Sequence, residues 1–373
     1  MKIVHIQQFF NDGFGYQENL LPEYQKDLGN EVILITSTRS DGFNGESRIK
    51  DEGIYIENNF LVRRIKIISE FPRRFVIFKN LYKELEDEKP DYIFHHSVTS
   101  PSIFVVAKYK KNNPNVLISM DNHADLQISG RNILWKVFYY NFFWKISLKC
   151  INKYVDVFFG VTPDRCLFLK NELGIPSEKV KLLPIGTDIK RIVLSGKSDE
   201  YNDMIPADKK IIVHGGKMSL RKNTDHLINA FNKLNTDDYH LILFGSIEDE
   251  YLTKLIEKSP GVTFLGWLNR QQTLSLLKDS YLGVWNCQHT TLIEDAIGCE
   301  LPLLIKRYGS TSHLISREDI YLEEDTEKEI TDKLQIVLSD KYIRELKNRT
   351  KEVKKSISYY NIAKKSIDFV VSR

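Results

Sequence analysis

A glycine turn followed by two lysines is the part of this sequence best suited to binding phosphate. An apolar run from residue 210 ends at Gly215-Gly216, and Lys217 and Lys222 follow before a helical pattern begins. Glycines let the backbone approach a phosphate closely, and lysine ammonium groups neutralise its charge. The pattern therefore predicts a site for a nucleotide diphosphate. The alternative is an ordinary strand-to-helix turn with two solvated lysines.

Acidic residues at the start of a later helical pattern could hold the ribose of the same ligand. Glu294 and Asp295 precede an apolar, strand-like run at 301–305, and a carboxylate accepts hydrogen bonds from hydroxyl groups. Thr290 and Thr291 lie just before them, where the free N–H groups of a helix start favour an anion. The alternative is a core helix that carries one acid at its edge.

Length and composition indicate the class of protein. The 373 residues are too many for one common domain and sufficient for two with substantial cores. A hydrophobic content of 42% and a charged content of 28% are typical of soluble globular proteins, and a net charge of +3 is too small to indicate nucleic acid. The four cysteines form no Cys-x-x-Cys pair, which argues against a disulfide framework or a zinc site and favours a reducing, cytoplasmic location. The first residues read as a strand, and no apolar run is long enough to span a membrane.

Short apolar runs alternate with helix-like stretches along the whole chain. Continuous runs of Val, Ile and Leu separated by helices indicate parallel sheets covered on both faces. The strands expected in a first sheet are 3–6, 32–36, 61–67, 92–95, 116–120 and 157–161. Those expected in a second sheet are 211–213, 240–244, 262–265, 282–285 and 301–305. The polar stretch 189–208 between the two sets is predicted to be a linker.

The second half of the chain resembles the donor half of the retaining glycosyltransferases of family four, which have the GT-B fold. Gly216-Lys217 and Lys222 stand where that family has a Gly-Arg turn and a later lysine. The further matches are the strand-end glycines Gly245 and Gly266, the strand-start proline Pro302 and the segment 183–188 (Leu-Pro-Ile-Gly-Thr-Asp). The likeness extends over essentially the whole chain and is strongest in this half.

The resemblance implies an α/β protein with two Rossmann-like domains, whose parallel sheets face a central cleft, and a C-terminal helix that crosses back to the first domain. Residues 1–186 would form an N-terminal acceptor-binding domain, 187–352 a C-terminal nucleotide-sugar donor domain, and 353–373 the returning helix. The second domain would then contain all the donor-side residues named above.

The implied function is that of a hexosyltransferase in the synthesis of a bacterial surface polysaccharide. It would move a sugar, with retention, from a nucleotide diphosphate sugar to a glycan or polyprenyl-linked acceptor. A UDP-sugar is favoured over a GDP-sugar as co-substrate, and the family needs no metal or other cofactor. The alternatives are a sugar-nucleotide epimerase or a hydrolase of the same fold, and a non-catalytic partner protein.

The donor-side acids depart from the family pattern. The family has two Glu residues separated by seven positions, one near the donor sugar and one on the ribose. If Glu294 is the ribose acid, Asn286 stands where the first Glu is expected. A register shifted by one residue makes Asp295 the ribose acid and Cys287 the first position. We prefer Glu294, because Glu is the family's residue and reaches further. His289 replaces a glycine of the family and is expected to touch the sugar or phosphate.

Residues that follow two strands of the first sheet are candidate site residues in the N-terminal domain. Gly13 and Gly15 open a helix, where free N–H groups could meet the donor phosphate, and a plain tight turn is the alternative. His123 follows the fifth strand, near the position of a functional histidine in the family. It could instead be a hydrogen-bonded turn residue, or form a metal site with Asp121 and Asp125.

Two sets of site residues follow from these matches. The expected catalytic residues are His123, Lys217, Lys222, Asn286 and His289. The expected donor-binding residues are Gly13, Gly15, Gly216, Gly245, Gly266, Trp267, Thr290, Thr291 and Glu294. No residue is expected to bind a metal ion.

The segment 126–155 is rich in cations and aromatic residues and contains no acid. On a helical wheel, one stripe combines both kinds of residue: Arg131, Trp135, Phe138, Phe142, Lys145, Lys149 and Lys153. A second, apolar stripe is expected to pack on the sheet: Ile133, Val137, Tyr140, Trp144, Leu148 and Ile151. Cationic stems beside aromatic rings suit an anionic lipid surface, so residues 131–153 predict peripheral attachment to the inner face of the cell membrane. The alternative is a helix packed on both faces, and no recognised nucleic-acid-binding fold accompanies the segment.

Overall fold

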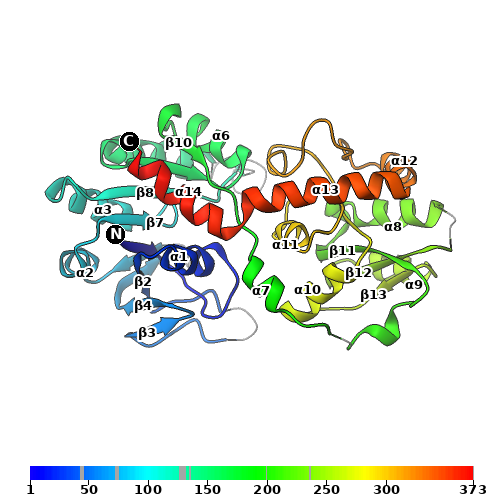
Figure 1. The fold of residues 1–373 in the computed structure, drawn as a ribbon. Helices are drawn as coiled ribbons and strands as arrows, with labels where there is room; N and C mark the ends of the chain where they lie inside the picture. Colours follow the sequence, from blue (N-terminus) through cyan, green and yellow to red (C-terminus); the bar gives the residue numbers. More distant parts are fainter. Residues whose placement is uncertain are drawn as a thin grey trace. The chain divides into compact units, whose positions relative to one another are not determined.

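The computed structural model describes residues 1–42, 46–71, 75–125, 132–133, 136–198, 200–234 and 237–372. The chain divides into two compact units (Figure 1). One consists of Met1–Ile185 together with Tyr359–Arg373, and the other consists of Gly186–Ser358. The C-terminal segment therefore joins the first unit from Tyr359 on, later than the residue 353 expected from the sequence.

The first unit is built on a parallel sheet. Within the described residues this sheet has eight strands in the order β10-β9-β8-β7-β1-β2-β4-β3, and β3 pairs antiparallel with β4. The strands are β1 (Lys2–Gln7), β2 (Glu31–Ser37), β3 (Gly53–Glu57), β4 (Phe60–Ile65), β7 (Tyr92–His95), β8 (Leu117–Asn122), β9 (Val157–Gly160) and β10 (Val180–Leu182). The expected strands are present, except that the run expected at 61–67 ends at Ile65 and Ile67 belongs to a separate hairpin. β3 and β10 were not predicted, because β3 is an exposed edge strand and β10 has only three residues.

Helices cover both faces of this sheet, because alternate residues of each strand point to opposite sides. Val4 of β1 packs in the core formed with α2 (Leu81–Glu88), α3 (Ser102–Asn112), α5 (Lys145–Ile151) and α6 (Pro163–Asn171). The neighbouring Ile3 packs in a second core with α1 (Gln17–Asp27) and α14 (Tyr359–Val371). A hairpin of β5 (Ile67–Phe71) and β6 (Phe75–Phe78) adds to the first core. One face of the C-terminal helix is thus part of the first unit's core.

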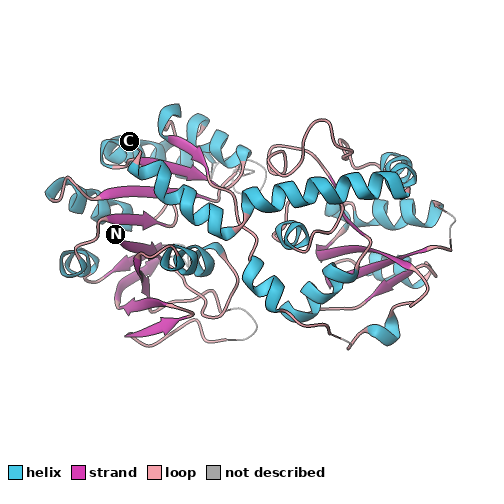
Figure 2. Ribbon diagram, viewed as in Figure 1, coloured by secondary structure: helices cyan, strands magenta, loops and turns pink. Residues whose placement is uncertain are grey.

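The second unit repeats this architecture (Figure 2). Among its described residues five parallel strands lie in the order β13-β12-β11-β14-β15. They are β11 (Lys210–Met218), β12 (Tyr239–Ile247), β13 (Val262–Phe264), β14 (Leu282–Trp285) and β15 (Leu303–Ile305). One face packs on α8 (Thr224–Lys233), α9 (Glu250–Glu257) and α12 (Glu327–Val337), the other on α10 (Arg270–Asp279) and α11 (Leu292–Gly298), and α13 (Asp340–Ile357) contributes to both cores. The predicted fold class, an α/β protein with two parallel sheets, is confirmed.

The predicted linker 189–208 is not irregular throughout. Ile189–Leu194 forms the helix α7, and Asp188 caps it by accepting a hydrogen bond from the Arg191 backbone N–H at 3.2 Å. A carboxylate at this position satisfies one of the free N–H groups of a helix start. The linker prediction relied on polar composition and overlooked this cap.

The basic, aromatic segment is helical, but not as one α-helix. Lys136–Trp144 forms a π-helix that continues into α5, and Arg131 and Trp135 lie outside the described residues. Four members of the predicted sheet-facing stripe are buried: Tyr140, Trp144, Leu148 and Ile151. Ile133 and Val137 are instead 75% and 45% exposed. The prediction was wrong for these two because the i→i+5 bonds of a π-helix change the number of residues per turn. An α-helical wheel therefore misplaces Val137, in the first turn of the π-helix, and Ile133 before it.

Candidate active site

The glycine turn of the second unit lies at the carboxyl end of β11. Gly216 (φ +123°) pairs with Gly245 (φ +117°) of β12, and the Gly245 N–H donates to the Gly266 carbonyl at 2.8 Å. A Cβ atom on Gly245 would lie 2.1 Å from the Gly216 carbonyl oxygen, so glycine is required there by both contact and conformation. This close approach determines where the chain leaves the sheet, and Lys217 and Lys222 follow directly.

Lys222 is the cation best placed to hold a phosphate. It is half-buried and lines a small cavity of about 30 Å³ together with His214 and Thr290. Burial lowers the pKa of Lys222, and within the described residues its ammonium group has no ion-pair partner. Lys217, by contrast, is exposed and pairs with Glu248 at 2.6 Å. Of these two lysines, Lys222 is therefore the one left for a ligand to neutralise.

His214 was not among the predicted site residues, yet it lines the same cavity. Its Nδ1 lies 2.8 Å from the Val284 carbonyl oxygen, which can only accept, so Nδ1 carries the proton. Burial lowers the pKa of His214 to about 4, with a further contribution from Lys222. The neutral ring therefore keeps Nε2 as an acceptor. The signal in the sequence is a histidine that interrupts an apolar strand directly before the glycine turn.

The two adjacent acids on α11 have different partners. Asp295 forms a two-point ion pair with Arg270, whose Nη2 lies 2.7 Å from Oδ1. Glu294 is 1% exposed, and its Oε1 accepts a hydrogen bond from Nε2 of His289 at 2.7 Å. In the described part of the chain, Oε2 of Glu294 is buried without a hydrogen-bond partner. An acceptor oxygen is therefore left over at Glu294, whereas the carboxylate of Asp295 is occupied by Arg270.

Of the other predicted donor-side residues, Asn286 stabilises the turn that contains Asn223, and Thr291 and Trp267 are exposed. Asn286 is fully buried, and its Nδ2 donates to the Asn223 carbonyl at 2.8 Å. It thereby anchors the turn immediately after Lys222. Thr291 is exposed at the start of α11, and Trp267 is 75% exposed. Asn286 therefore has a structural role in holding this turn, which its position in the sequence does not indicate.

In the first unit, the predicted glycine loop connects β1 to α1. Gly13 has φ +76°, and its N–H donates to Oε1 of Glu57 at 2.7 Å. Gly15 is exposed, with open space where a side chain would stand. The N–H of Gly13 thus already has an anionic acceptor within its own unit, while the surroundings of Gly15 are free.

His123 lies at the carboxyl end of β8, and its side chain is 46% exposed. Its Nε2 is 3.5 Å from Oδ2 of Asp121, a fully buried carboxylate that also lies 3.0 Å from Nδ1 of His96. Burial opposes ionisation of Asp121, but His123 and His96 outweigh it and hold the pKa of that carboxyl below its usual range. Asp125 pairs instead with Arg165 at 3.6 Å. The described residues contain no group of three or more His, Cys, Asp or Glu side chains that could hold a metal ion.

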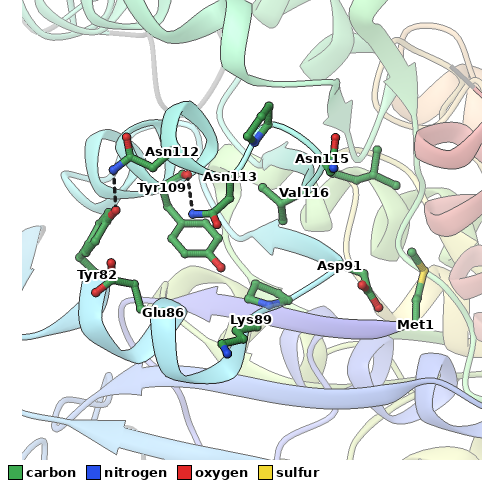
Figure 3. A pocket seen from close by; sticks show the side chains of 13 residues that line it. Met1, Tyr82, Glu86, Lys89, Asp91, Tyr109, Asn112, Asn113, Asn115 and Val116 are labelled. Atoms are coloured by element: carbon green, nitrogen blue, oxygen red, sulfur yellow. Dashed lines mark hydrogen bonds between the residues drawn. The ribbon is translucent and has the colours of Figure 1, made fainter.

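A larger cavity, of about 820 Å³, lies at the opposite edge of the same sheet, near the amino ends of β7 and β8 (Figure 3). Its walls include Tyr109 and Asn112, which donates to the Tyr82 hydroxyl at 2.7 Å. Ligands of parallel α/β sheets bind outside the carboxyl ends of the strands. None of the predicted site residues lines this cavity, so it is distinct from the candidate active site.

Both units match models of glycosyltransferase families. Residues 16–191 match the model described as "Glycosyltransferase Family 4", and residues 200–356 match "Glycosyl transferases group 1". The chain is a GT-B glycosyltransferase. No match was found among curated protein sequences.

The fold of this glycosyltransferase is also that of several solved structures. HepE of Anabaena in complex with UDP and glucose is 14% identical, with a TM-score of 0.68 and all of both chains covered. A glycosyltransferase from Rickettsia africae is 13% identical (TM-score 0.71; 100% of this chain and 98% of that chain). Sucrose-phosphate synthase from Thermosynechococcus elongatus is 15% identical (TM-score 0.68; 100% and 98%). At these identities the likeness concerns the fold.

Within the second unit of the glycosyltransferase, the structure brings together part of the predicted set. Lys217, Lys222, Gly216 and Thr290 line one cavity, and His289 contacts Glu294. Asn286 and Trp267 do not line this cavity. In the first unit, His123 is coupled to a buried carboxylate that sequence reasoning had considered only as a metal ligand.

Proposed function

We propose that this glycosyltransferase is a hexosyltransferase that moves a sugar, with retention, from a nucleotide diphosphate sugar to a glycan or polyprenyl-linked acceptor of surface polysaccharide synthesis. A UDP-sugar is favoured over a GDP-sugar, and the structure of HepE with UDP and glucose supports that choice. The observation that carries the proposal is the half-buried ammonium group of Lys222, which lies beside the glycine turn and has no carboxylate partner in the described residues.

Each donor-side group would meet a different part of the donor. Lys222 would stabilise the negative charge that grows on the departing diphosphate, the kind of electrostatic contribution that is usually the largest in catalysis. Glu294 would accept hydrogen bonds from the ribose hydroxyls through Oε2, with His289 holding its other oxygen. His214, neutral and hydrogen-bonded through Nδ1, would offer Nε2 as an acceptor beside the phosphate-binding cation.

Nucleotide binding tests the proposal directly. UDP should raise the melting temperature, because a ligand that binds the native state stabilises it. Lys222→Met removes the charge but keeps an apolar stem, and it should weaken UDP binding by about 1.5–3 kcal/mol, the range for a hydrogen bond to a charged group. Lys254→Met on the exposed face of α9 is the matched control and should leave affinity unchanged. Calorimetry that detects neither UDP nor GDP binding would refute the proposal.

Product analysis separates transfer from the alternative activities. Incubation with a panel of nucleotide sugars, with and without a polyprenyl-linked glycan, should give acceptor-dependent release of UDP and a product that keeps the donor's anomeric configuration by NMR. Release without acceptor would indicate a hydrolase, and conversion of the donor sugar would indicate an epimerase. Binding of donor without any reaction would indicate a non-catalytic partner protein.

We further propose that the π-helix face attaches the enzyme peripherally to the inner, anionic surface of the cell membrane. Phe138 and Phe142 are 66% and 63% exposed there, and Lys149 and Lys153 are exposed close by along the chain. Exposed aromatic rings beside cations suit the headgroup region of an anionic bilayer. Among the described residues, no helix combines the length and apolar character needed to cross a bilayer.

A further inference from the structure

A series of hydrogen bonds within the first unit connects Asp121, which lies 3.5 Å from Nε2 of His123, to the C-terminal helix. From Asp121 it continues through His96 and His5, whose Nε2 and Nδ1 atoms are 3.0 Å apart. His5 Nε2 lies 2.7 Å from Oε1 of Gln25 on α1, and Gln25 Nε2 donates to Oγ of Ser366 on α14 at 2.8 Å. Apart from His123, all the side chains in this hydrogen-bond series are buried.

The C-terminal helix determines the direction of these hydrogen bonds. The Ser366 hydroxyl donates to the Ala363 carbonyl at 2.6 Å, so its oxygen must accept the hydrogen bond from the amide nitrogen of Gln25. The amide oxygen of Gln25 therefore faces His5, and because it can only accept, Nε2 of His5 carries the proton. The burial of His5 favours its neutral form, which leaves Nδ1 of His5 as an acceptor.

The same reasoning requires two protons on His96. Its Nε2 must donate to the acceptor Nδ1 of His5. Its Nδ1 faces Oδ2 of Asp121, a carboxylate whose two oxygens are approached by the Ser97 N–H and by Nε2 of His123 as well, so the carboxylate is placed to accept from His96. A histidine that donates from both nitrogens is an imidazolium ion. Asp121 also accepts a hydrogen bond from the Ser97 backbone N–H at 2.8 Å, which adds to the stabilisation of its charge.

We propose that His96 is a buried imidazolium that keeps Asp121 ionised. The Asp121 carboxylate then orients the ring of His123 by its contact with Nε2 of that ring. Helix α14 sets the protonation pattern of the histidines through the hydrogen bond between Ser366 and Gln25. His96 and Asp121 are thus positioning residues, and His123 alone of the three presents an exposed ring. The inference rests on the proposed role of His123 in transfer. It adds a reason for the C-terminal helix to pack into the first unit.

The charge of His96 depends on every titratable group near it. Asp121 favours the imidazolium, and His5 and His95 oppose a second positive charge. Glu18 on α1 also interacts with His96 and His123, although burial raises its pKa. Asp121 has the shortest contact with His96 among the acids, and it is the group whose removal should discharge the ring.

NMR of protein labelled with ¹⁵N-histidine tests the proposal without any substrate. At neutral pH, both ring nitrogens of His96 should show the shifts of protonated nitrogen, with the signals assigned by their loss in His96→Gln. In the isosteric Asp121→Asn, one nitrogen should become unprotonated. In Ser366→Ala, which frees the amide of Gln25 to rotate, His5 should populate both neutral tautomers. An unprotonated nitrogen on His96 in the wild type would overturn the proposal, and a single unchanged tautomer of His5 in Ser366→Ala would remove α14 from it.

Kinetics then test the positioning role. With a nucleotide-sugar donor and acceptor, Asp121→Asn and His96→Gln should each lower kcat about tenfold or more and leave the donor KM near that of wild type, as expected when orientation of a catalytic histidine is lost. If the NMR pattern is as expected but no transfer occurs with any donor, the proposed function fails and the protonation pattern stands. If transfer is normal in both variants, the positioning role fails and the proposed function stands.

Discussion

At the scale of single residues, the donor side depends on polar atoms that the protein leaves without an internal partner. A buried charge or carboxylate oxygen without a partner costs stability, so its presence favours a ligand-binding role. Within the described residues, Oε2 of Glu294 is such a group, and the ammonium group of Lys222 is half-buried without an ion-pair partner. Asp295 is not, because the guanidinium of Arg270 occupies its carboxylate.

This difference predicts the behaviour of two neighbouring variants. Glu294→Ala should reduce UDP affinity by about 1.5–3 kcal/mol, the range for hydrogen bonds to a charged group. Asp295→Ala should leave UDP affinity near wild type but lower the melting temperature, because Arg270 loses its partner. Titration calorimetry combined with thermal unfolding distinguishes the two effects. A loss of affinity in Asp295→Ala alone would assign the ribose to that acid and exclude Glu294.

At the scale of elements, the site depends on the close approach of β11 and β12 at their paired glycines. Gly245→Ala would place a Cβ 2.1 Å from the Gly216 carbonyl at a φ of +117°, a conformation that side chains rarely adopt. We expect a loss of about 1–3 kcal/mol of stability together with weaker UDP binding, since the strand ends must separate. Gly196→Ala, whose nearest neighbour would be 3.8 Å away, is the control in the same unit. Unchanged UDP affinity in a folded Gly245→Ala protein would contradict the role of this contact.

The π-helix and α5 make a second prediction at this scale. Lys149→Gln combined with Lys153→Gln should weaken binding to vesicles containing anionic lipid by about 1 kcal/mol per lysine. Lys145 is left out because it is partly buried beside Gly174. The matched control replaces Lys83 and Lys111, which are exposed elsewhere on the unit, with Gln. Vesicle sedimentation measures the difference, and a wild-type protein that stays in the supernatant would refute the membrane proposal.

At the scale of the whole molecule, three buried histidines should make the protein less stable in mild acid. Burial lowers the pKa of His5 to about 3 and the pKa values of His95 and His214 to about 4. Unfolded histidine titrates near 6.5. Below that pH the unfolded chain binds protons that these native residues do not, so their contribution to stability, present above about pH 6.5, is lost as the pH falls.

Each of these histidines should account for about 1 kcal/mol of lost stability between about pH 7.5 and 5.5. Thermal unfolding at the two pH values measures the net change, to which every titrating group contributes. His214→Asn keeps an N–H group near the position of Nδ1 and should show a smaller pH-dependent loss than wild type. His226→Asn, at a half-buried position on α8, should leave the loss unchanged. Equal melting temperatures at both pH values would contradict the prediction.

The sequence by itself determined the two parallel sheets, most of their strands and the glycine turn. These features are encoded locally: a continuous apolar run indicates a buried strand, and paired glycines indicate a turn. The same local signals placed Lys222 beside the turn and Glu294 on a later helix. The edge strand β3 escaped prediction because it is exposed, and β10 because it has only three residues. The π-helix escaped prediction because its i→i+5 bonds give a period other than that of an α-helix.

Only the tertiary structure decided which polar groups have partners. Asp295 is occupied by Arg270, 25 residues away, and Asn286 anchors the backbone of Asn223, 63 residues away. The Val284 carbonyl on a neighbouring strand fixes the tautomer of His214. The hydrogen bonds that determine the proposed protonation of His96 end at Ser366 on α14. Hydrogen bonds and ion pairs between such distant segments depend on how the sheets and helices pack, and residue spacing along the chain does not contain that information.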